Sequence, residues 1–113
     1  MGGLLSDGDN NPRLKALRTF AEQRPQDPFP RYALGMELKS GGDSQGAWAI
    51  FEALIAEHPD YIACYAPAGE VLVSLGRIED ARAVYGKGIE ACVRIGNAHM
   101  RGNLEDVLAA LGE

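Results

Sequence analysis

Cysteine and histidine are scarce in this chain of 113 residues, which has two of each. Cys64 and Cys92 lie far apart with no CxxC spacing, so they form neither a disulfide framework nor a zinc site. We interpret both as buried, reduced thiols. The histidines, His58 and His99, are also isolated, and we expect His58 to be an ordinary residue of a helix C-terminus. The sequence therefore predicts no metal and no cofactor.

Long apolar runs and excess positive charge are lacking as well. No stretch approaches the roughly 20 apolar residues that a membrane-spanning helix needs. The formal net charge is −5, whereas binding to nucleic acid needs a basic stripe. The start of the chain has no positive leader followed by a hydrophobic stretch, so no secretory signal is indicated. We expect a cytoplasmic protein that has neither a membrane nor a nucleic acid as its partner.

Motifs that would indicate catalysis are also missing. No arrangement of serine, cysteine or histidine suggests an activated nucleophile, and no phosphate-binding loop occurs. Residues 7–11 have the oxygen spacing that opens a calcium loop, but Pro12 and Arg18 stand where that loop needs a glycine and a carboxylate. Residues 1–6 match a loose myristoylation pattern without a polybasic second signal. We predict that the chain is not an enzyme and that residues 1–11 are a disordered leader.

Glycine, by contrast, is plentiful, and two glycines fall in the middle of predicted helices. Gly35 lies in a segment of helical periodicity, where glycine costs about 1 kcal/mol relative to alanine. A shift of 34 residues places Gly69 opposite Gly35. The same shift aligns further small or apolar residues: Leu38 with Leu72, Gly42 with Gly76, Ala47 with Ala81 and Phe51 with Tyr85. These matches at a single offset indicate an internal repeat.

Each copy of the repeat predicts two antiparallel helices. In the first copy, apolar residues recur at three- and four-residue spacings on both sides of a turn at residues 40–43. The second copy turns at Gly76, and Pro59 separates the copies because proline disfavours helix in the residue before it. Pro67 should delay or bend the first helix of the second copy. That copy has no closing proline, so its last helix should run on to about Gly96.

The repeated pattern resembles the tetratricopeptide repeat. That family has a small residue plus glycine in the first helix, a glycine at the turn, alanine, an aromatic and a small residue in the second helix, and a closing proline. The copies match it at Leu34, Gly35, Leu38, Gly42, Ala47, Phe51, Leu54 and Pro59, and at Ala68, Gly69, Leu72, Gly76, Ala81, Tyr85 and Gly88. Arg31 departs from the pattern, because the family usually has a large aromatic there; Tyr65 fills that role in the second copy.

The resemblance implies an all-α fold, a right-handed superhelix of antiparallel helix pairs with about six helices. Residues 12–113 would form a single domain. We expect a half-repeat helix at 12–24, repeat one at 28–61, repeat two at 62–95 and a capping helix at 97–111. The capping helix should carry its apolar residues on one side: Met100, Leu104, Val107, Leu108 and Leu111. Gly35 and Gly69 should let the helices of each pair approach closely, with an aromatic ring filling the space.

The resemblance also implies where the chain binds its partner. In this family the first helices line a concave groove that takes an extended peptide or a helix. The groove positions hold mostly apolar residues: Phe29, Tyr32, Met36, Lys39, Ala63, Ala66, Glu70 and Val73. One subfamily grips the carboxylate terminus of chaperones, but Tyr32, Met36 and Pro67 stand at positions of that clamp here. An apolar or amphipathic ligand is therefore preferred.

Two function classes remain. The first is a non-catalytic interaction module, an adaptor or chaperone-like protein, that binds a peptide or helix of a partner protein in the groove. The alternative is a self-associating, homo-oligomeric scaffold such as a homodimer, formed through the open end of the stack. The unpaired first helix and an apolar stripe at Trp48 and Ile55 favour that alternative. In so short an array, some groove residues could instead pack against the flanking helices.

Overall fold

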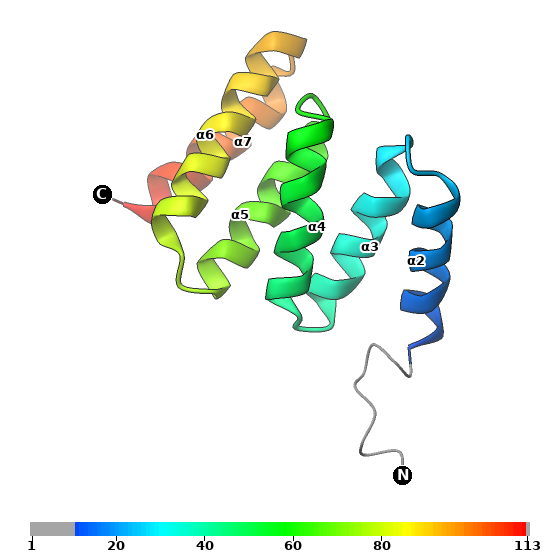
Figure 1. Ribbon diagram of the computed structural model, residues 1–113. Helices are drawn as coiled ribbons and strands as arrows, with labels where there is room; N and C mark the ends of the chain where they lie inside the picture. Colours follow the sequence, from blue (N-terminus) through cyan, green and yellow to red (C-terminus); the bar gives the residue numbers. More distant parts are fainter. Residues whose placement is uncertain (1–10, 113) are drawn as a thin grey trace.

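All regular secondary structure between residues 11 and 112, the part of the chain that the computed structural model describes, is helical (Figure 1). The expectations for the leader (residues 1–11), the calcium pattern (7–11) and the myristoylation pattern (1–6) lie outside this range except at Asn11, which precedes the first described helix as its N-cap. Six α-helices and one short 3₁₀ helix follow one another: α2 Pro12–Gln23, α3 Pro28–Ser40, α4 Ser44–Glu57, η2 Ile62–Cys64, α5 Tyr65–Ser74, α6 Ile78–Ile95 and α7 Ala98–Leu111. The predicted all-α class with six helices is confirmed for the described residues.

Short polar side chains determine where four of the helices begin. The side-chain oxygens of Asn11, Asp27, Asp43 and Asn97 accept hydrogen bonds from backbone N–H groups two or three residues further on, in α2, α3, α4 and α7. These contacts satisfy donors that have no partner within the helix, and each is typically worth about 1 kcal/mol. Proline at the start of α2 and α3 adds a backbone angle already suited to a helix.

Pro67 delays α5, as predicted. The chain first forms the 3₁₀ helix η2, and α5 begins at Tyr65, so that Pro67 is its third residue. A backbone N–H at that position would have no acceptor within the helix, so proline is tolerated there. The prediction for the end of the second copy is confirmed as well. Helix α6 runs for 18 residues and stops at Gly96, which has a left-handed φ of 79°.

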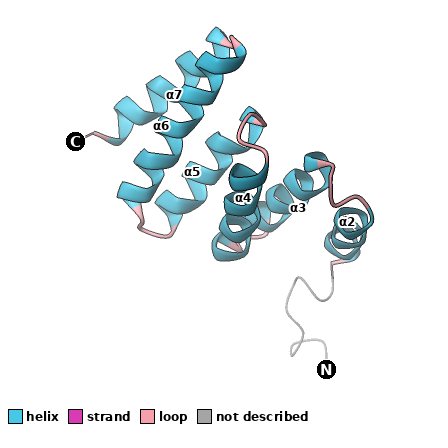
Figure 2. Cartoon of the chain, turned by 45° about the horizontal axis from the view of Figure 1, so that its top comes forward, coloured by secondary structure: helices cyan, strands magenta, loops and turns pink. Residues whose placement is uncertain are grey.

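The helices form antiparallel pairs that stack into an elongated array (Figures 1 and 2). Helix α3 packs on α4 and α5 packs on α6, while α4 also packs on α5 and thereby joins the two pairs. The flanking helices complete the stack, α2 against α3 and α7 against α6. Packing therefore follows chain order, as expected of a repeat whose units contact mainly their neighbours. The array measures 48 × 31 × 19 Å along its principal axes.

Aromatic rings fill the crossing within each helix pair. Phe51 of α4 and Tyr85 of α6 are among the most deeply buried side chains, at 0% and 1% exposure. A Cβ atom added to Gly35 would lie only 2.6 Å from Cε1 of Phe51, and one added to Gly69 would lie even closer to Tyr85. Real Cβ atoms do not approach other atoms this closely, so a side chain at either position would displace the ring. The predicted close approach at both glycines is confirmed.

A third glycine lets the last helix pack onto the array. A Cβ atom added to Gly88 would lie 2.8 Å from Tyr65 and 2.9 Å from Leu104 of α7. Leu104 is fully buried. Three further residues of α7 are partly buried against the core: Met100, Leu108 and Leu111. Val107 lies on the predicted apolar side of α7, about 60° around the helix from Leu104, but it is 38% exposed and so forms the edge of that side.

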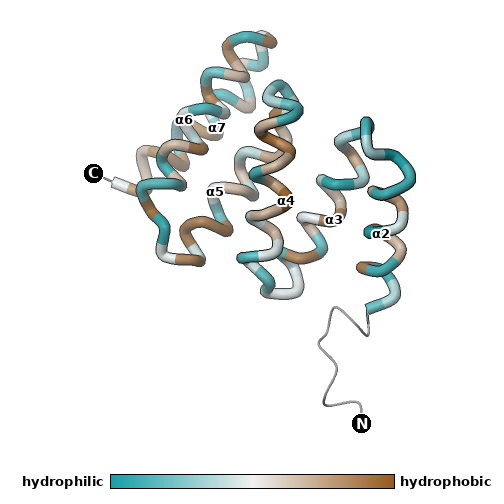
Figure 3. Tube along the Cα trace, viewed as in Figure 1, coloured by the Kyte–Doolittle hydropathy of each residue, from teal (hydrophilic) through white to brown (hydrophobic). Residues whose placement is uncertain are grey.

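Apolar and polar residues are interspersed along each helix (Figure 3). Such a mixture is typical of a surface helix that buries one side and leaves the other in water. Within residues 11–112, no helix is long and apolar enough to cross a membrane.

We expect Gly35→Ala to lower the free energy of unfolding by about 1–3 kcal/mol, because the added methyl group would overlap the buried ring of Phe51. Gly86→Ala is the matched control. Gly86 also lies inside a helix, but no atom lies within 4 Å of a Cβ added there, so alanine should stabilise by about 0.5–1 kcal/mol. Urea unfolding followed by circular dichroism measures both variants. If Gly35→Ala is as stable as the wild type, this close approach is not a constraint on the fold.

Candidate functional site

The residues predicted to line a groove lie on α3, η2 and α5. Four of them, at positions 29, 32, 36 and 39, are three or four residues apart along α3 and therefore share one side of that helix. Phe29 is 54% exposed and Val73 is 36% exposed, and Glu70 is also open to solvent. The remaining members are half-buried: Tyr32, Met36, Lys39, Ala63 and Ala66. The predicted set is thus a partly open surface with its most exposed aromatic at the start of α3.

The two charged members of this set form an ion pair between the helices. Nζ of Lys39, near the end of α3, lies 2.8 Å from Oε1 of Glu70 on α5. Both side chains are partly exposed, so the pair adds no more than about 1 kcal/mol to stability. The pair matters more for the charge of this surface, because its two opposite charges cancel there.

Three aromatic rings form a row, here called the aromatic row, at the opposite end of α3: Phe29, Tyr32 and Tyr61. The centroids of Phe29 and Tyr32 are 6.5 Å apart. Tyr32 meets Tyr61 edge to face, with centroids 5.6 Å apart and ring planes at 63°. Both distances lie in the range that aromatic pairs prefer. Burial raises the pKa of the Tyr61 phenol above its usual value, and the neighbouring Tyr32, Cys64 and Asp27 raise it further.

Sequence reasoning did not find Tyr61. A shift by one repeat places it opposite Asp27 in the first copy, so the repeat pattern contains no aromatic signal there. It also lies in the connection between α4 and η2, outside the predicted helices. Only the tertiary structure brings it beside Tyr32.

An open depression of about 300 Å³ lies along this side of α3. It is lined by one residue of α2 and a stripe of α3: Arg13, Phe29, Tyr32, Ala33, Met36, Glu37 and Ser40. Three predicted residues, Phe29, Tyr32 and Met36, are therefore brought together, whereas the members on η2 and α5 do not line the depression. Nε of Arg13 lies 2.8 Å from Oε1 of Glu37, so the opposite charges of these two residues at the rim also cancel. Neither of those two was among the predicted groove residues, which were taken from the groove positions of the first helix of each repeat.

A second recess lies between α4 and α6. Two cavities of about 200 and 510 Å³ adjoin there and share Glu52, Ile55 and Lys87. Trp48 is at one end, with the guanidinium carbon of Arg77 5.7 Å from its ring centroid. Trp48 and Ile55 are half-buried, so the predicted apolar stripe on α4 is partly covered. The recess contains charges of both signs and no exposed aromatic ring.

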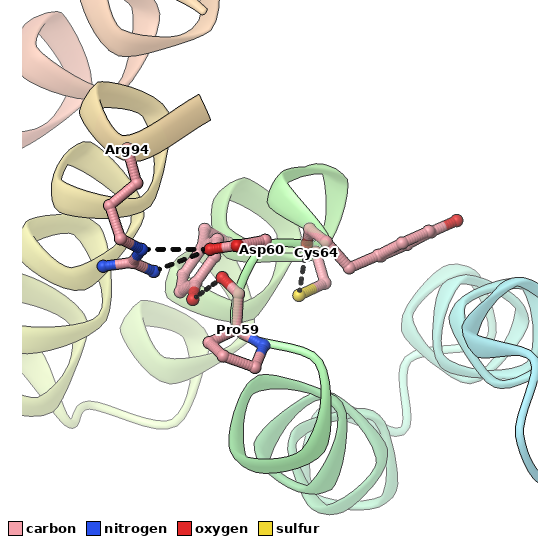
Figure 4. Close-up of polar contacts among 6 residues, drawn as sticks. Pro59, Asp60, Cys64 and Arg94 are labelled. Atoms are coloured by element: carbon pink, nitrogen blue, oxygen red, sulfur yellow. Dashed lines mark hydrogen bonds and ion pairs between the residues drawn. The ribbon is translucent and has the colours of Figure 1, made fainter. Parts of the chain in front are cut away.

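Polar contacts fix the connection between the two repeats (Figure 4). The hydroxyl of Tyr65 donates to the backbone carbonyl of Pro59 at 2.5 Å. Nε and Nη2 of Arg94 both donate to Oδ1 of Asp60, at 3.1 and 2.9 Å. These contacts tie the segment just before Tyr61 to α5 and α6. They therefore hold the third ring of the aromatic row in place.

The arrangement offers no evident catalytic chemistry among residues 11–112. No group of three or more His, Cys, Asp or Glu residues there could hold a metal ion. Cys64 and Cys92 are buried free thiols, as predicted. Burial raises the pKa of both, that of Cys64 to about 11. A nucleophilic cysteine needs a lowered pKa and access to solvent, and these two have neither.

No protein-family model and no curated protein matches this chain. Among solved structures, it is similar to the solution NMR structure of a tetratricopeptide repeat domain protein from Salinibacter ruber, with 34% identity and a TM-score of 0.73. That match covers 78% of this chain and 89% of the other. A crystal structure of the tetratricopeptide repeat domain protein from S. ruber matches with 34% identity and a TM-score of 0.71, covering 76% and 96% of the two chains.

We expect the thiols of the native protein to react with a disulfide reagent at pH 8 at least about 100-fold more slowly than the same thiols in urea. With a pKa of about 11, only about a thousandth of Cys64 is thiolate at pH 8, against roughly a quarter of an ordinary cysteine. Burial slows the reaction of both thiols further. The release of chromophore over time measures the rate. Fast reaction of either thiol in the native state would contradict its burial.

Proposed function

This chain belongs to the tetratricopeptide repeat family, and on that premise we propose that it is a non-catalytic interaction module, an adaptor or chaperone-like protein. In this proposal, a peptide or helix of a partner protein lies in the concave groove, against α3 and α5. Helical repeats of this kind generally present an extended concave surface for binding.

The observation that carries this proposal is the open apolar surface of α3. A single exposed apolar side chain is ordinary in any protein. Here Phe29, Tyr32 and Met36 lie together on one depression of about 300 Å³, and more than half of the Phe29 surface is open. Exposed apolar groups that gather in this way mark interaction sites.

The ion pairs around this surface support an apolar or amphipathic partner segment. Arg13 with Glu37 and Lys39 with Glu70 flank the apolar residues. An apolar centre with a polar rim is the usual anatomy of a protein interface. Because the rim charges cancel in pairs, they favour neither a strongly acidic nor a strongly basic ligand. The proposed partner is therefore a protein, not a nucleic acid or a membrane.

Site-specific crosslinking tests where the partner binds. A photo-crosslinking amino acid replaces Phe29 in one variant and Glu52, in the recess between α4 and α6, in a second. We expect the variant at position 29 to capture a defined partner from native lysate, and the variant at position 52 to capture none. Capture from position 52 alone would show that the partner lies on the opposite side, and would overturn the proposed groove.

Substitutions then measure the contribution of single side chains. We expect Phe29→Ala and Met36→Ala each to weaken binding of the captured partner by about 1–2 kcal/mol, as anchoring residues do. Lys39→Glu should mainly change the salt dependence of binding, because rim charges act through long-range attraction. Gln45→Ala, an exposed residue of α4, is the control. Calorimetric titration gives the affinities, and thermal melting of each variant shows whether the fold is intact. Unchanged affinity of both alanine variants would refute the assignment.

One observation favours the alternative of a homodimer. Helix α2 packs chiefly on α3 and has a single buried residue, Leu14. Leu17 and Phe20 of the same helix are only partly buried, although Arg24 covers the Phe20 ring at 5.3 Å from its centroid. A second copy could therefore pair with this open end of the stack. Light scattering at several concentrations distinguishes the two, since a mass that doubles from 12.1 kDa with concentration requires self-association.

A further inference from the structure

The aromatic row lies beside a carboxylate that has no cationic partner among the described residues. Asp27 precedes α3, and its Oδ1 accepts a hydrogen bond from the backbone N–H of Phe29 at 3.0 Å. Asp27 also contributes, after burial, Tyr32 and Cys64, to raising the pKa of Tyr61 at the other end of the row. None of the ion pairs between residues 11 and 112 includes Asp27. Its charge is therefore available to a ligand that lies on the row.

The other carboxylates of this region are engaged. They form ion pairs with basic residues of neighbouring helices: Glu37 with Arg13, Glu57 with Arg31, Asp60 with Arg94 and Glu70 with Lys39. The two basic residues nearest to Asp27 in sequence are directed elsewhere, Arg24 onto the ring of Phe20 and Arg31 to Glu57. Neither of these cations competes for the row.

We propose that the aromatic row, with Asp27 at its edge, receives a basic side chain of the partner, arginine above all. This inference rests on the proposed function, since the basic residue belongs to the segment that lies in the groove. A planar guanidinium can stack on the ring faces and donate hydrogen bonds to the carboxylate at the same time. The partner segment is then amphipathic, with apolar residues over Met36 and one arginine over the row.

Two electrostatic arguments favour a basic side chain over an apolar one at this place. An apolar group on the row would remove water from Asp27 without offering a partner, which is unfavourable for a carboxylate. The positive end of the α3 dipole opposes a cation, but it amounts to only about half a charge near the helix start. The full charge of Asp27 outweighs it, and the net charge of −5 attracts basic ligands over a longer range.

A pair of small probes tests the inference without the natural partner. N-acetyl-arginine amide and N-acetyl-citrulline amide have nearly the same shape, but only the first is charged. We expect millimolar arginine amide to shift the ring signals of Phe29, Tyr32 and Tyr61 in NMR spectra, with binding about fivefold to tenfold weaker for citrulline amide. Equal shifts with both compounds, or shifts confined to other surfaces, would overturn the inference.

Variants at two helix caps complete the test. Asp27→Asn removes the charge and keeps a side chain that caps helices equally well, so the fold should be preserved. We expect it to weaken the binding of arginine amide at least about threefold. Asp43→Asn makes the same change at the cap of α4 and should leave binding unchanged. An Asp27→Asn variant that melts normally and binds as the wild type would overturn the role of the carboxylate.

The outcomes separate this inference from the proposed function. If crosslinking from position 29 captures a partner and arginine amide has no preference for the row, the proposed groove is supported. The inference that the row receives a basic side chain of the partner is then wrong. If arginine amide binds the row and position 29 captures nothing, the cation site stands and the proposed groove for a protein partner is wrong.

Discussion

The contact of an aromatic ring with the bare backbone of a glycine sets the geometry of both helix pairs. Gly35 and Gly69 each lower the intrinsic stability of their helix by about 1 kcal/mol. In return, the rings of Phe51 and Tyr85 are almost completely buried, and full burial of such a ring contributes about 2–3 kcal/mol. The balance favours close packing. Because this contact fixes how far apart the helices lie, it also fixes the surface that each pair presents.

The graded exposure along α3 follows from that contact. Successive residues of an α-helix are rotated by about 100°. With Gly35 facing α4, the side chains of Lys39 and Tyr32 lie about 40° and 60° from the buried direction, Met36 about 100°, and Phe29 about 120°. The first three are half-buried and Phe29 is 54% exposed. The residues proposed to bind a partner are thus supported by the core on one side, which limits the side-chain freedom that binding would remove.

Features that recur in both copies could be predicted from the sequence, because the repeat shows each of them twice. The glycine–aromatic crossings and the turn at Gly76 are examples, and local backbone chemistry was enough for Pro67 and Gly96. Tertiary contacts that occur only once could not be predicted. Tyr61 lies in a connection without an aromatic counterpart, and Arg13 meets Glu37 only because α2 packs on α3. The exposure of Val107 could not be predicted either, because helical periodicity gives the apolar side of a helix but not how far a neighbouring helix covers it.

The two ends of the stack differ in how firmly they are held, and the proposed binding surface lies near the weaker end. At the C-terminal end, α7 buries Leu104 fully and three more residues partly against the long helix α6. At the N-terminal end, α2 buries Leu14, and Leu17 is its only partly buried residue that packs against the core. The Arg13–Glu37 pair that joins α2 to α3 has a largely exposed arginine and is therefore weak. Local unfolding begins where few apolar contacts hold an element. Helix α2 can therefore shift at less cost than any crossing at Gly35 or Gly69, so the depression that it borders can adapt to a ligand while the array keeps its shape.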